Sequence, residues 1–208
     1  MPRRNPHDEL GPLKLGMIVD LAQVSDKTLC GALAVTANPV IVSHSSMRPL
    51  SNVPRNVSDE MLRALAENRG VIGINFGMGF INSKDAEALR SATDTEAEAP
   101  SLTGRALDEF AAQNARKLFG KKSQVVATLE DAADHIDQAV KIAGINHVGI
   151  GSDFDGISTT ANGLEDVSKI PALVAVLLKR GYAENDLKKI LGENHLRVVR
   201  QVTGGKIE

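Results

Sequence analysis

The sequence predicts an α/β protein built on a parallel sheet. Four short apolar runs occur along the 208 residues, and each is followed by a polar or glycine-rich stretch and then by helical periodicity. That alternation is typical of βα units, whose strands pair in parallel. Continuous apolar runs of strand length also indicate strands covered on both faces. Four βα units are too few to close an eight-stranded barrel, and an open four-stranded sheet is the alternative architecture.

The predicted strands are the apolar runs themselves. They cover residues 17–20, within a longer apolar stretch at 14–22, and residues 39–44, 70–76 and 147–153. The first and last of these strands would lie at the edges of the sheet. Unpaired edges recruit partners unless they are blocked, so we expect something to cover them.

The first four predicted helices begin at a polar cap or a proline, three of them carry an apolar stripe that faces the core, and a last helical pair closes the chain. The predicted helices cover about residues 25–35, 58–66, 128–143, 171–181, 184–191 and 193–202. The clearest start is Thr128 with Asp131, which resembles a capping box. Ser25 and Ser58 are the N-cap residues expected for the first two helices.

Two segments do not follow the βα pattern. Residues 81–105 have no clear period and are rich in Ala, Glu, Asp, Ser and Thr, so we predict an irregular excursion over the C-terminal edge of the sheet. Residues 1–14 read as an N-terminal tail, without the apolar segment of a secretory signal. The chain, 1–208, is therefore predicted to be a single domain.

Composition argues against several classes of protein. The formal net charge is −2 and aromatic residues make up 3% of the chain, so a nucleic-acid surface is not predicted. No apolar run approaches the roughly 20 residues of a membrane span. The single cysteine, Cys30, excludes an internal disulfide and favours a reducing compartment. The sequence thus predicts a cytoplasmic protein with no membrane partner.

Candidate site residues follow the strand ends, because the C-terminal ends of parallel strands converge on one binding face. These ends are polar, at residues 20–23, 43–46, 75–77 and 152–156. His44 and Asp153 follow different strands, and a histidine with a carboxylate is a candidate for a metal or acid–base site. The alternative is a hydrogen-bonded structural histidine and a turn-forming aspartate.

Several other motifs are weaker evidence for a functional site. The Asp-Phe-Asp-Gly segment at 153–156 begins like a calcium loop, but Ile157 takes the place of an oxygen ligand. Gly149 and Gly151 lie inside a predicted strand, which argues against a dinucleotide turn. His135 is predicted to be a surface residue in mid-helix, and His195 a partly buried structural residue.

The order of the motifs resembles the membrane (renal) dipeptidase family, zinc peptidase family M19. The motifs are Asp-Leu-Ala-x-Val-Ser at 20–25, Ser-His-Ser at 43–45, Pro-Arg-Asn at 54–56, Gly-Val-Ile-Gly-Ile-Asn-Phe at 70–76, Val-Gly-Ile-Gly-Ser-Asp-Phe-Asp-Gly at 148–156 and Gly-Leu-Glu-Asp-Val-Ser at 163–168. Family members are complete (β/α)8 barrels that carry zinc and hydrolyse dipeptides. The collinear match, from about residue 16 onward, implies a half TIM-type (β/α) barrel, the C-terminal half of that fold.

The resemblance implies roles for three residues. His44 matches a histidine ligand of the second zinc, Arg55 the arginine that holds the substrate's C-terminal carboxylate, and Asp153 the aspartate that handles the substrate's amino end and proton transfer. Gln23 occupies the position of the family's other histidine ligand on that zinc. An amide oxygen is a far weaker zinc ligand than an imidazole nitrogen.

The remaining zinc ligands of the family belong to its N-terminal half, so one standard ligand, His44, is expected here. We therefore expect weak or absent zinc binding and a dipeptidase that is inactive alone or dependent on a partner. The alternative is a non-catalytic half-barrel that serves as an interaction or scaffold protein. The expected partners are a dipeptide and either a second copy of the chain or the missing N-terminal half.

Overall fold

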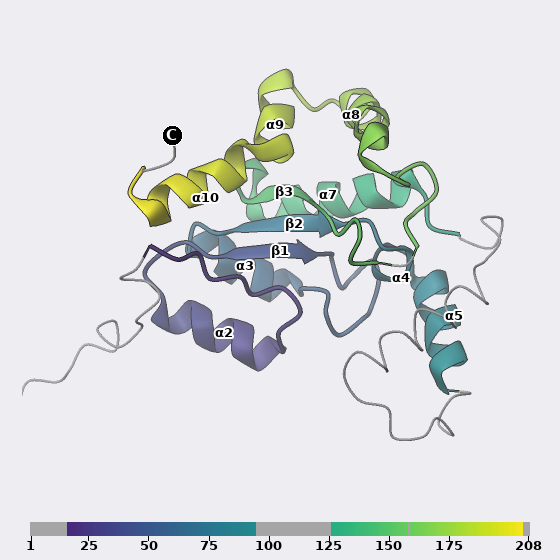
Figure 1. The fold of residues 1–208 in the computed structure, drawn as a ribbon, viewed down its shortest axis with the longest axis horizontal. Coiled ribbons are helices and arrows are strands. Elements are labelled where there is room, and N and C mark those ends of the chain that lie inside the picture. The colour runs from purple at the N-terminus through teal and green to yellow at the C-terminus, as the bar shows by residue number, and fades with distance from the viewer. Residues whose placement is uncertain (1–15, 95–125, 158, 206–208) are drawn as a thin grey trace, which may run out of the picture.

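The computed structural model describes residues 16–94, 126–157 and 159–205, and these form an α/β fold around a parallel sheet (Figure 1). Strands β1 (Ile41–Ser45), β2 (Val71–Asn75) and β3 (Val148–Ser152) lie in the order β1-β2-β3, and both pairs are parallel. The predicted α/β class and parallel pairing are confirmed. The predicted tail at 1–14 and the end of the predicted excursion at 95–105 lie outside the described residues.

The prediction of a full strand at 17–20 is wrong. Asp20 forms an isolated parallel bridge with Ile41, supported by hydrogen bonds from the Leu21 N–H to the Ile41 carbonyl (2.8 Å) and from the Ile41 N–H to the Val19 carbonyl (3.0 Å). The Asp20 carboxylate accepts the N–H of Ala22 at 3.0 Å, which turns the chain away after one bridge. The described sheet therefore has three strands and one bridge rather than four strands.

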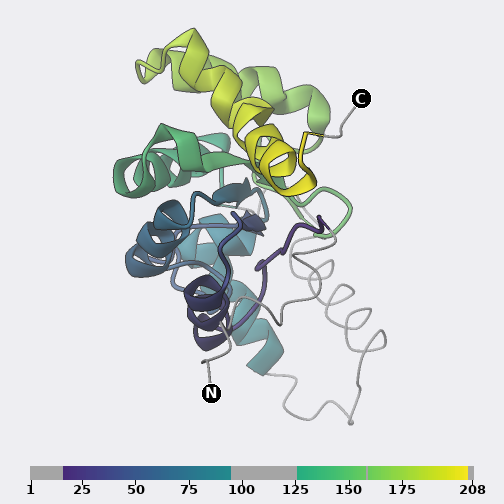
Figure 2. The same ribbon diagram turned by 90° about the vertical axis from the view of Figure 1, so that its left-hand side faces the viewer.

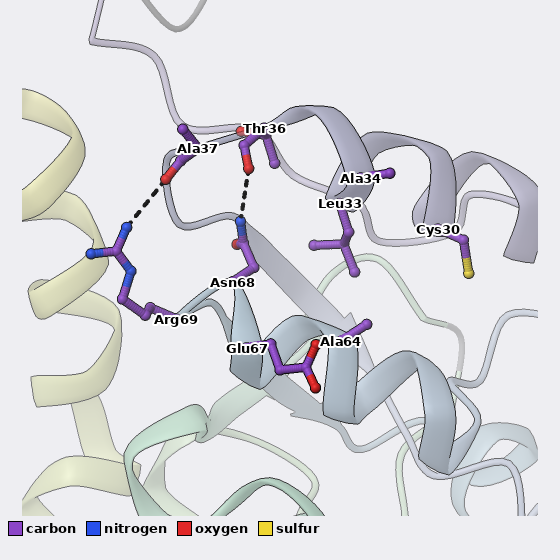
Figure 3. Close-up of a pocket in the computed structure, with 9 residues that line it drawn as sticks. All are labelled: Cys30, Leu33, Ala34, Thr36, Ala37, Ala64, Glu67, Asn68 and Arg69. Carbon is purple, nitrogen blue, oxygen red and sulfur yellow. Dashed lines mark hydrogen bonds between the residues drawn. The ribbon is translucent and has the colours of Figure 1, made fainter. Parts of the chain in front are cut away.

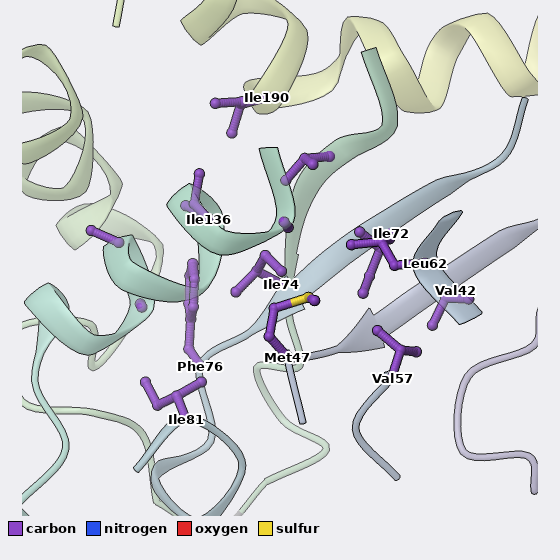
Figure 4. Packing of buried hydrophobic residues seen from close by; sticks show 14 of the residues in the cluster. Val42, Met47, Val57, Leu62, Ile72, Ile74, Phe76, Ile81, Ile136 and Ile190 are labelled. Atoms are coloured by element: carbon purple, nitrogen blue, oxygen red, sulfur yellow. The ribbon is translucent and has the colours of Figure 1, made fainter. Parts of the chain in front are cut away.

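One face of the sheet is covered by helices, and we call it the helical face. Helices α2 (Asp26–Val35), α3 (Asp59–Glu67) and α7 (Leu129–Ala143) lie on this side in Figure 2. Figure 4 shows the core that they enclose with the sheet. Its buried side chains include Val42, Met47, Val57, Leu62, Ile72, Ile74, Phe76, Ile81, Ile136 and Ile190.

The opposite face is lined by glycine, and we call it the glycine face. Near the strand starts, Val71 packs against Val198 and Val202 of helix α10 (Asn194–Thr203). Further along, a Cβ on Gly73 would collide with the main-chain carbonyl of Ser43, and one on Gly149 would collide with the His195 ring. The strands therefore carry no side chains of their own at these positions, and the His195 ring packs directly against Gly149. His195 is partly buried, as predicted, and burial lowers the pKa of its imidazole.

The helix caps follow the sequence closely. Ser25 and Ser58 each accept a backbone N–H three residues on, and Thr128 with Asp131 forms both bonds of a capping box. The chain ends in α8 (Ile170–Lys179), α9 (Glu184–Lys188), the π-helical turn η5 (Lys189–Glu193) and α10, after short 3-10 turns η3 (Ile145–His147) and η4 (Val167–Lys169). None of the described helices has the length and apolar character needed to cross a bilayer.

The prediction of an irregular segment from residue 81 is wrong for its first part. Helix α4 (Met78–Ile81) is followed by α5 (Ser83–Asp94), which begins where the Asn82 side chain accepts the Lys84 N–H at 3.0 Å. The buried Asp85 carboxylate accepts the N–H groups of Val126 (3.1 Å) and Ala127 (2.6 Å). A polar residue on the packed side of α5 interrupts the apolar stripe, which explains why periodicity did not reveal the helix.

His135 is fully buried in α7, which corrects its prediction as a surface residue. Its Nδ1 accepts the Met47 N–H at 2.9 Å and its Nε2 lies 3.0 Å from the Ile81 carbonyl, so Nε2 carries the proton. The imidazole thus joins α7 to the loop after β1 and to α4. Burial lowers the pKa of His135 to about 4, from an ordinary value of 6.5.

We predict that His135 makes stability depend on pH between about 4 and 6.5. The unfolded chain binds a proton in this range and the folded chain does not, so the stabilisation is complete above pH 6.5 and is lost as pH falls toward 4. The shift corresponds to about 3 kcal/mol. Urea unfolding of the native chain and of His135→Gln should give free energies whose difference shrinks by that amount between pH 7 and 4. Parallel pH profiles would contradict the assignment.

Candidate functional site

The candidate site lies where the strands of the sheet end. His44 is in β1, Asn75 ends β2, Asp153 follows β3 directly, and Arg55 lies in the loop between β1 and α3. The Arg55 Nη2 atom is 3.3 Å from the His44 carbonyl oxygen, to which it donates, and 3.7 Å from Asp153 Oδ2. The structure therefore brings together the three residues singled out from the sequence. Arg55 contacts the main chain of His44 and the carboxylate of Asp153, while the His44 ring is bonded to other residues.

Arg55 is held from several sides. The Ser45 hydroxyl donates to the Arg55 carbonyl at 2.8 Å, and the guanidinium lies 4.0 Å from the centre of the Phe80 ring. Among the described residues, Arg55 Nε is buried without a hydrogen-bond partner. Burial lowers the pKa of Arg55, while the nearby Asp153 raises it, and the guanidinium stays charged at neutral pH. The result is an oriented cation whose buried Nε–H has no hydrogen-bond partner among the described residues.

Asp153 is positioned by a residue that the sequence did not single out. The buried Asn75 side chain donates from Nδ2 to Asp153 Oδ2 at 2.8 Å, and its own Oδ1 accepts the Gly77 N–H. Because a main-chain N–H can only donate, this second bond fixes which end of the amide faces Asp153. Asp153 has a φ of 69°, in the left-handed region, and Phe154 packs edge-on to Phe76 with ring centres 5.9 Å apart. The signal in the sequence was a polar residue at the end of an otherwise apolar strand.

Both ring nitrogens of His44 are engaged. Its Nε2 lies 2.6 Å from the Gln23 amide nitrogen, and its Nδ1 lies 2.8 Å from the Ser43 hydroxyl. Gln23 has a φ of 63° and belongs to the turn between the Asp20 bridge and α2. The Asp20 carboxylate also accepts the Ser43 N–H at 3.0 Å, which ties this turn to β1.

The described residues do not fit a metal site. Across residues 16–94, 126–157 and 159–205, no group of three or more His, Cys, Asp or Glu side chains is arranged to hold an ion. A catalytic zinc site needs three protein ligands. His44 alone is of the expected kind, and its Nε2 is already bonded to Gln23. The Asp153 carboxylate is bonded to Asn75 and lies beside a cation, which does not favour a second cation there.

A surface pocket of about 470 Å3 lies between α2 and α3, away from the strand ends (Figure 3). Its polar side chains make hydrogen bonds to the main chain that stabilise the fold. Asn68 donates to the carbonyls of Thr36 (3.3 Å) and Asn38 (3.1 Å), and Arg69 donates to that of Ala37 (3.2 Å). Such a pocket offers no convergent catalytic groups, so we place the candidate site at the strand ends instead.

Known proteins with similar sequences are dipeptidases. Residues 13–206 match the family model described as membrane dipeptidase (peptidase family M19). The chain is 39% identical to an uncharacterized dipeptidase of Schizosaccharomyces pombe over 186 residues, which are 89% of this chain and 36% of that protein. It is 39% identical to the dipeptidase verJ of Clonostachys rogersoniana over 189 residues, 91% of this chain and 38% of that protein. The chain thus spans a little over a third of the length of these relatives.

Two solved structures share this fold. The probable dipeptidase PvdM from Pseudomonas aeruginosa superimposes with a TM-score of 0.75 at 30% identity, over 93% of this chain and 52% of that one. A metallo peptidase from Rhodobacter sphaeroides, solved with a phosphinate mimic of the dipeptide L-Ala-D-Ala, gives a TM-score of 0.69 at 23% identity, over 92% of this chain and 44% of that one. This chain therefore matches about half of each of these two folds.

We predict that Asn75→Leu lowers the free energy of unfolding by about 2–4 kcal/mol, because it leaves the Gly77 N–H and the Asp153 carboxylate without their partner. It should also remove the coupling energy between Arg55 and Asp153, measured by a double-mutant cycle with Arg55→Met and Asp153→Asn. Asn68→Leu is the matched control, since Asn68 makes comparable bonds far from the site. The control should lose stability and keep the coupling. Equal coupling in both backgrounds would show that Asn75 does not position Asp153.

Proposed function

The chain belongs to the membrane dipeptidase family (peptidase family M19), and from this premise we propose that it supplies the substrate-holding side of a dipeptidase site. The proposal is carried by one observation. A cation, Arg55, and a carboxylate, Asp153, meet 3.7 Å apart at the ends of the strands, largely shielded from solvent. A dipeptide has one negative and one positive end, so this pair matches its charges.

Arg55 is proposed to hold the C-terminal carboxylate of the dipeptide. A guanidinium binds a carboxylate best through two parallel N–H donors. The Arg55 side chain is 20% exposed, which supports contact between its guanidinium and such a carboxylate. Stacking on Phe80 keeps the guanidinium plane in place without using any of its N–H groups. A lysine side chain would supply the positive charge but not the two parallel N–H donors.

Asp153 is proposed to hold the amino end of the dipeptide. Its Oδ2 is bonded to Asn75, and the carboxylate as a whole keeps further acceptor capacity for an ammonium group. A dipeptide with both ends free would exchange the Arg55–Asp153 pair for two new pairs. Each partly buried charge would then keep a partner. Leaving such a charge unpaired is what costs free energy. The curated relatives are likewise named dipeptidases.

Hydrolysis is proposed only together with residues that this sequence does not contain. The described residues do not form a metal site, so we assign no metal-dependent step to them. We further propose that the sheet is part of a half (β/α) barrel. In that arrangement β3 and the Asp20 bridge are edges that pair with strands of a second chain or of a preceding segment.

A second candidate function is a non-catalytic binding or scaffold role. It is favoured by the bond between Gln23 and His44, which occupies the imidazole expected to face a metal. Under this proposal the chain holds a dipeptide, or another zwitterion with similarly spaced ends, without cleaving it. The two candidates share the binding step and differ only in turnover.

We predict that Arg55→Lys weakens dipeptide binding by about 10- to 100-fold, because a single-point contact replaces the fork. Isothermal titration of the chain with a dipeptide and with its C-terminal amide checks this. The amide should bind the native chain weakly, and Arg55→Lys should weaken it little further. Arg63→Lys, on the exposed side of α3, is the matched control. Equal losses for the dipeptide and its amide would reject Arg55 as the carboxylate group.

We also predict that the 208-residue chain alone binds a dipeptide without hydrolysing it. Adding a polypeptide that carries the family's N-terminal half, with zinc, should produce turnover. Chromatographic detection of the released amino acids checks both mixtures, with His44→Ala as a control for the combined site. Hydrolysis by the chain alone would show that it carries a complete site. A mixture that forms a stable complex but never cleaves would favour the scaffold function.

A further inference from the structure

We propose that Gln23 competes with metal ions for His44 and weakens their binding, because its side-chain amide occupies the ring nitrogen that an ion would need. The inference rests on the proposed function only in taking His44 as the histidine that would face a metal. The effect of Gln23 is therefore not limited to the loss of a histidine ligand at this position. It is a hydrogen-bonding group that competes with metal for one atom.

The competition follows from the geometry of the contact. The Gln23 amide nitrogen lies 2.6 Å from His44 Nε2. An amide nitrogen has hydrogens and no available lone pair, so it donates and the imidazole nitrogen accepts through its single lone pair. Zinc binds imidazole through the same lone pair, at about 2.0–2.1 Å. A metal ion and the Gln23 amide cannot occupy that position together.

The other ring nitrogen does not offer a way around this. With Nε2 accepting, the proton of the neutral ring is on Nδ1, which donates to the Ser43 hydroxyl at 2.8 Å. Turning the Gln23 amide around would place its oxygen against the ring, and Nε2 would then carry the proton. In the first orientation the Nε2 lone pair accepts the amide N–H, and in the second Nε2 carries the proton while Nδ1 accepts the Ser43 O–H, so neither orientation leaves a free lone pair on the ring. The conclusion therefore does not depend on which end of the amide faces His44.

The main chain places Gln23 in this position. Its φ of 63° lies in the left-handed region, which costs a residue with a side chain some free energy. The Asp20 carboxylate accepts the N–H groups of Ala22 and Ser43, both at 3.0 Å, and so holds the turn against β1. These bonds hold the main chain of Gln23 next to β1, within reach of His44, and the exposed Gln23 side chain contacts the ring from there.

A metal that binds His44 must first displace the amide, and this loses a hydrogen bond. The loss of one such bond weakens metal binding by about tenfold. Shortening the side chain should recover that factor. Replacing the amide with a carboxylate of the same shape should recover more, since a carboxylate is itself a zinc ligand.

The test is a zinc titration of the full chain followed by two-bond 1H–15N correlation spectra of the His44 ring, in the absence of dipeptide. Four chains are compared: native, Gln23→Asn, Gln23→Glu and, as a matched control, Gln138→Asn on α7. His44→Ala assigns the resonances. Because only His44 is observed, zinc bound elsewhere on the chain does not interfere. Urea midpoints confirm that each variant is folded.

We expect the His44 resonances to shift at zinc concentrations about tenfold lower in Gln23→Asn than in the native chain, and lower again in Gln23→Glu. The Gln138→Asn control should match the native chain. The proposal is overturned if Gln23→Asn differs from the native chain by less than about threefold, whatever Gln23→Glu does, because the carboxylate of that variant adds a zinc ligand of its own. Either result leaves dipeptide binding by Arg55 unaffected, so failure here and failure of the proposed function can be told apart.

Discussion

The burial of strand β2 on both faces is the constraint on which the rest of the structure depends. Ile72 and Ile74 lie in the core under α3 and α7, and Val71 lies under α10 on the other side. Because β2 pairs with both β1 and β3, its position sets theirs. The strand then ends in Asn75, whose buried amide orients Asp153. The five residues of β2 thus contribute side chains to both hydrophobic cores and to the candidate site.

Much of this arrangement could be predicted from the sequence, for physical reasons. Capping residues act on their own backbone within three residues, so Ser25, Ser58 and Thr128 could be read locally. The C-terminal ends of strands in a parallel sheet converge, so His44 and Asp153 could be predicted to belong to one site. The proximity of Arg55 to both came from the family resemblance. Without it, Arg55 would have remained an ordinary loop residue.

The features that were missed depend on contacts between distant parts of the chain. His135 is buried because Met47 and Ile81, far away in sequence, supply a donor and an acceptor for its ring. The run at 17–20 is apolar enough for a strand, but the carboxylate of Asp20 bonds to the backbone ahead of it and turns the chain. The pairing of Gln23 with His44 joins residues 21 positions apart. Periodicity and caps carry no information about such contacts.

The glycine face separates the residues that determine folding from those that can determine ligand preference during evolution. Gly73 and Gly151 present only main chain, and the His195 ring lies over Gly149, so the strands themselves offer few side chains that could distinguish one ligand from another. Preference for one ligand over another must then reside in the surrounding loops, which tolerate substitution far better than a packed sheet. Binding preference and folding can therefore be altered separately. A lineage could lose or replace its chemistry here and still keep the scaffold intact.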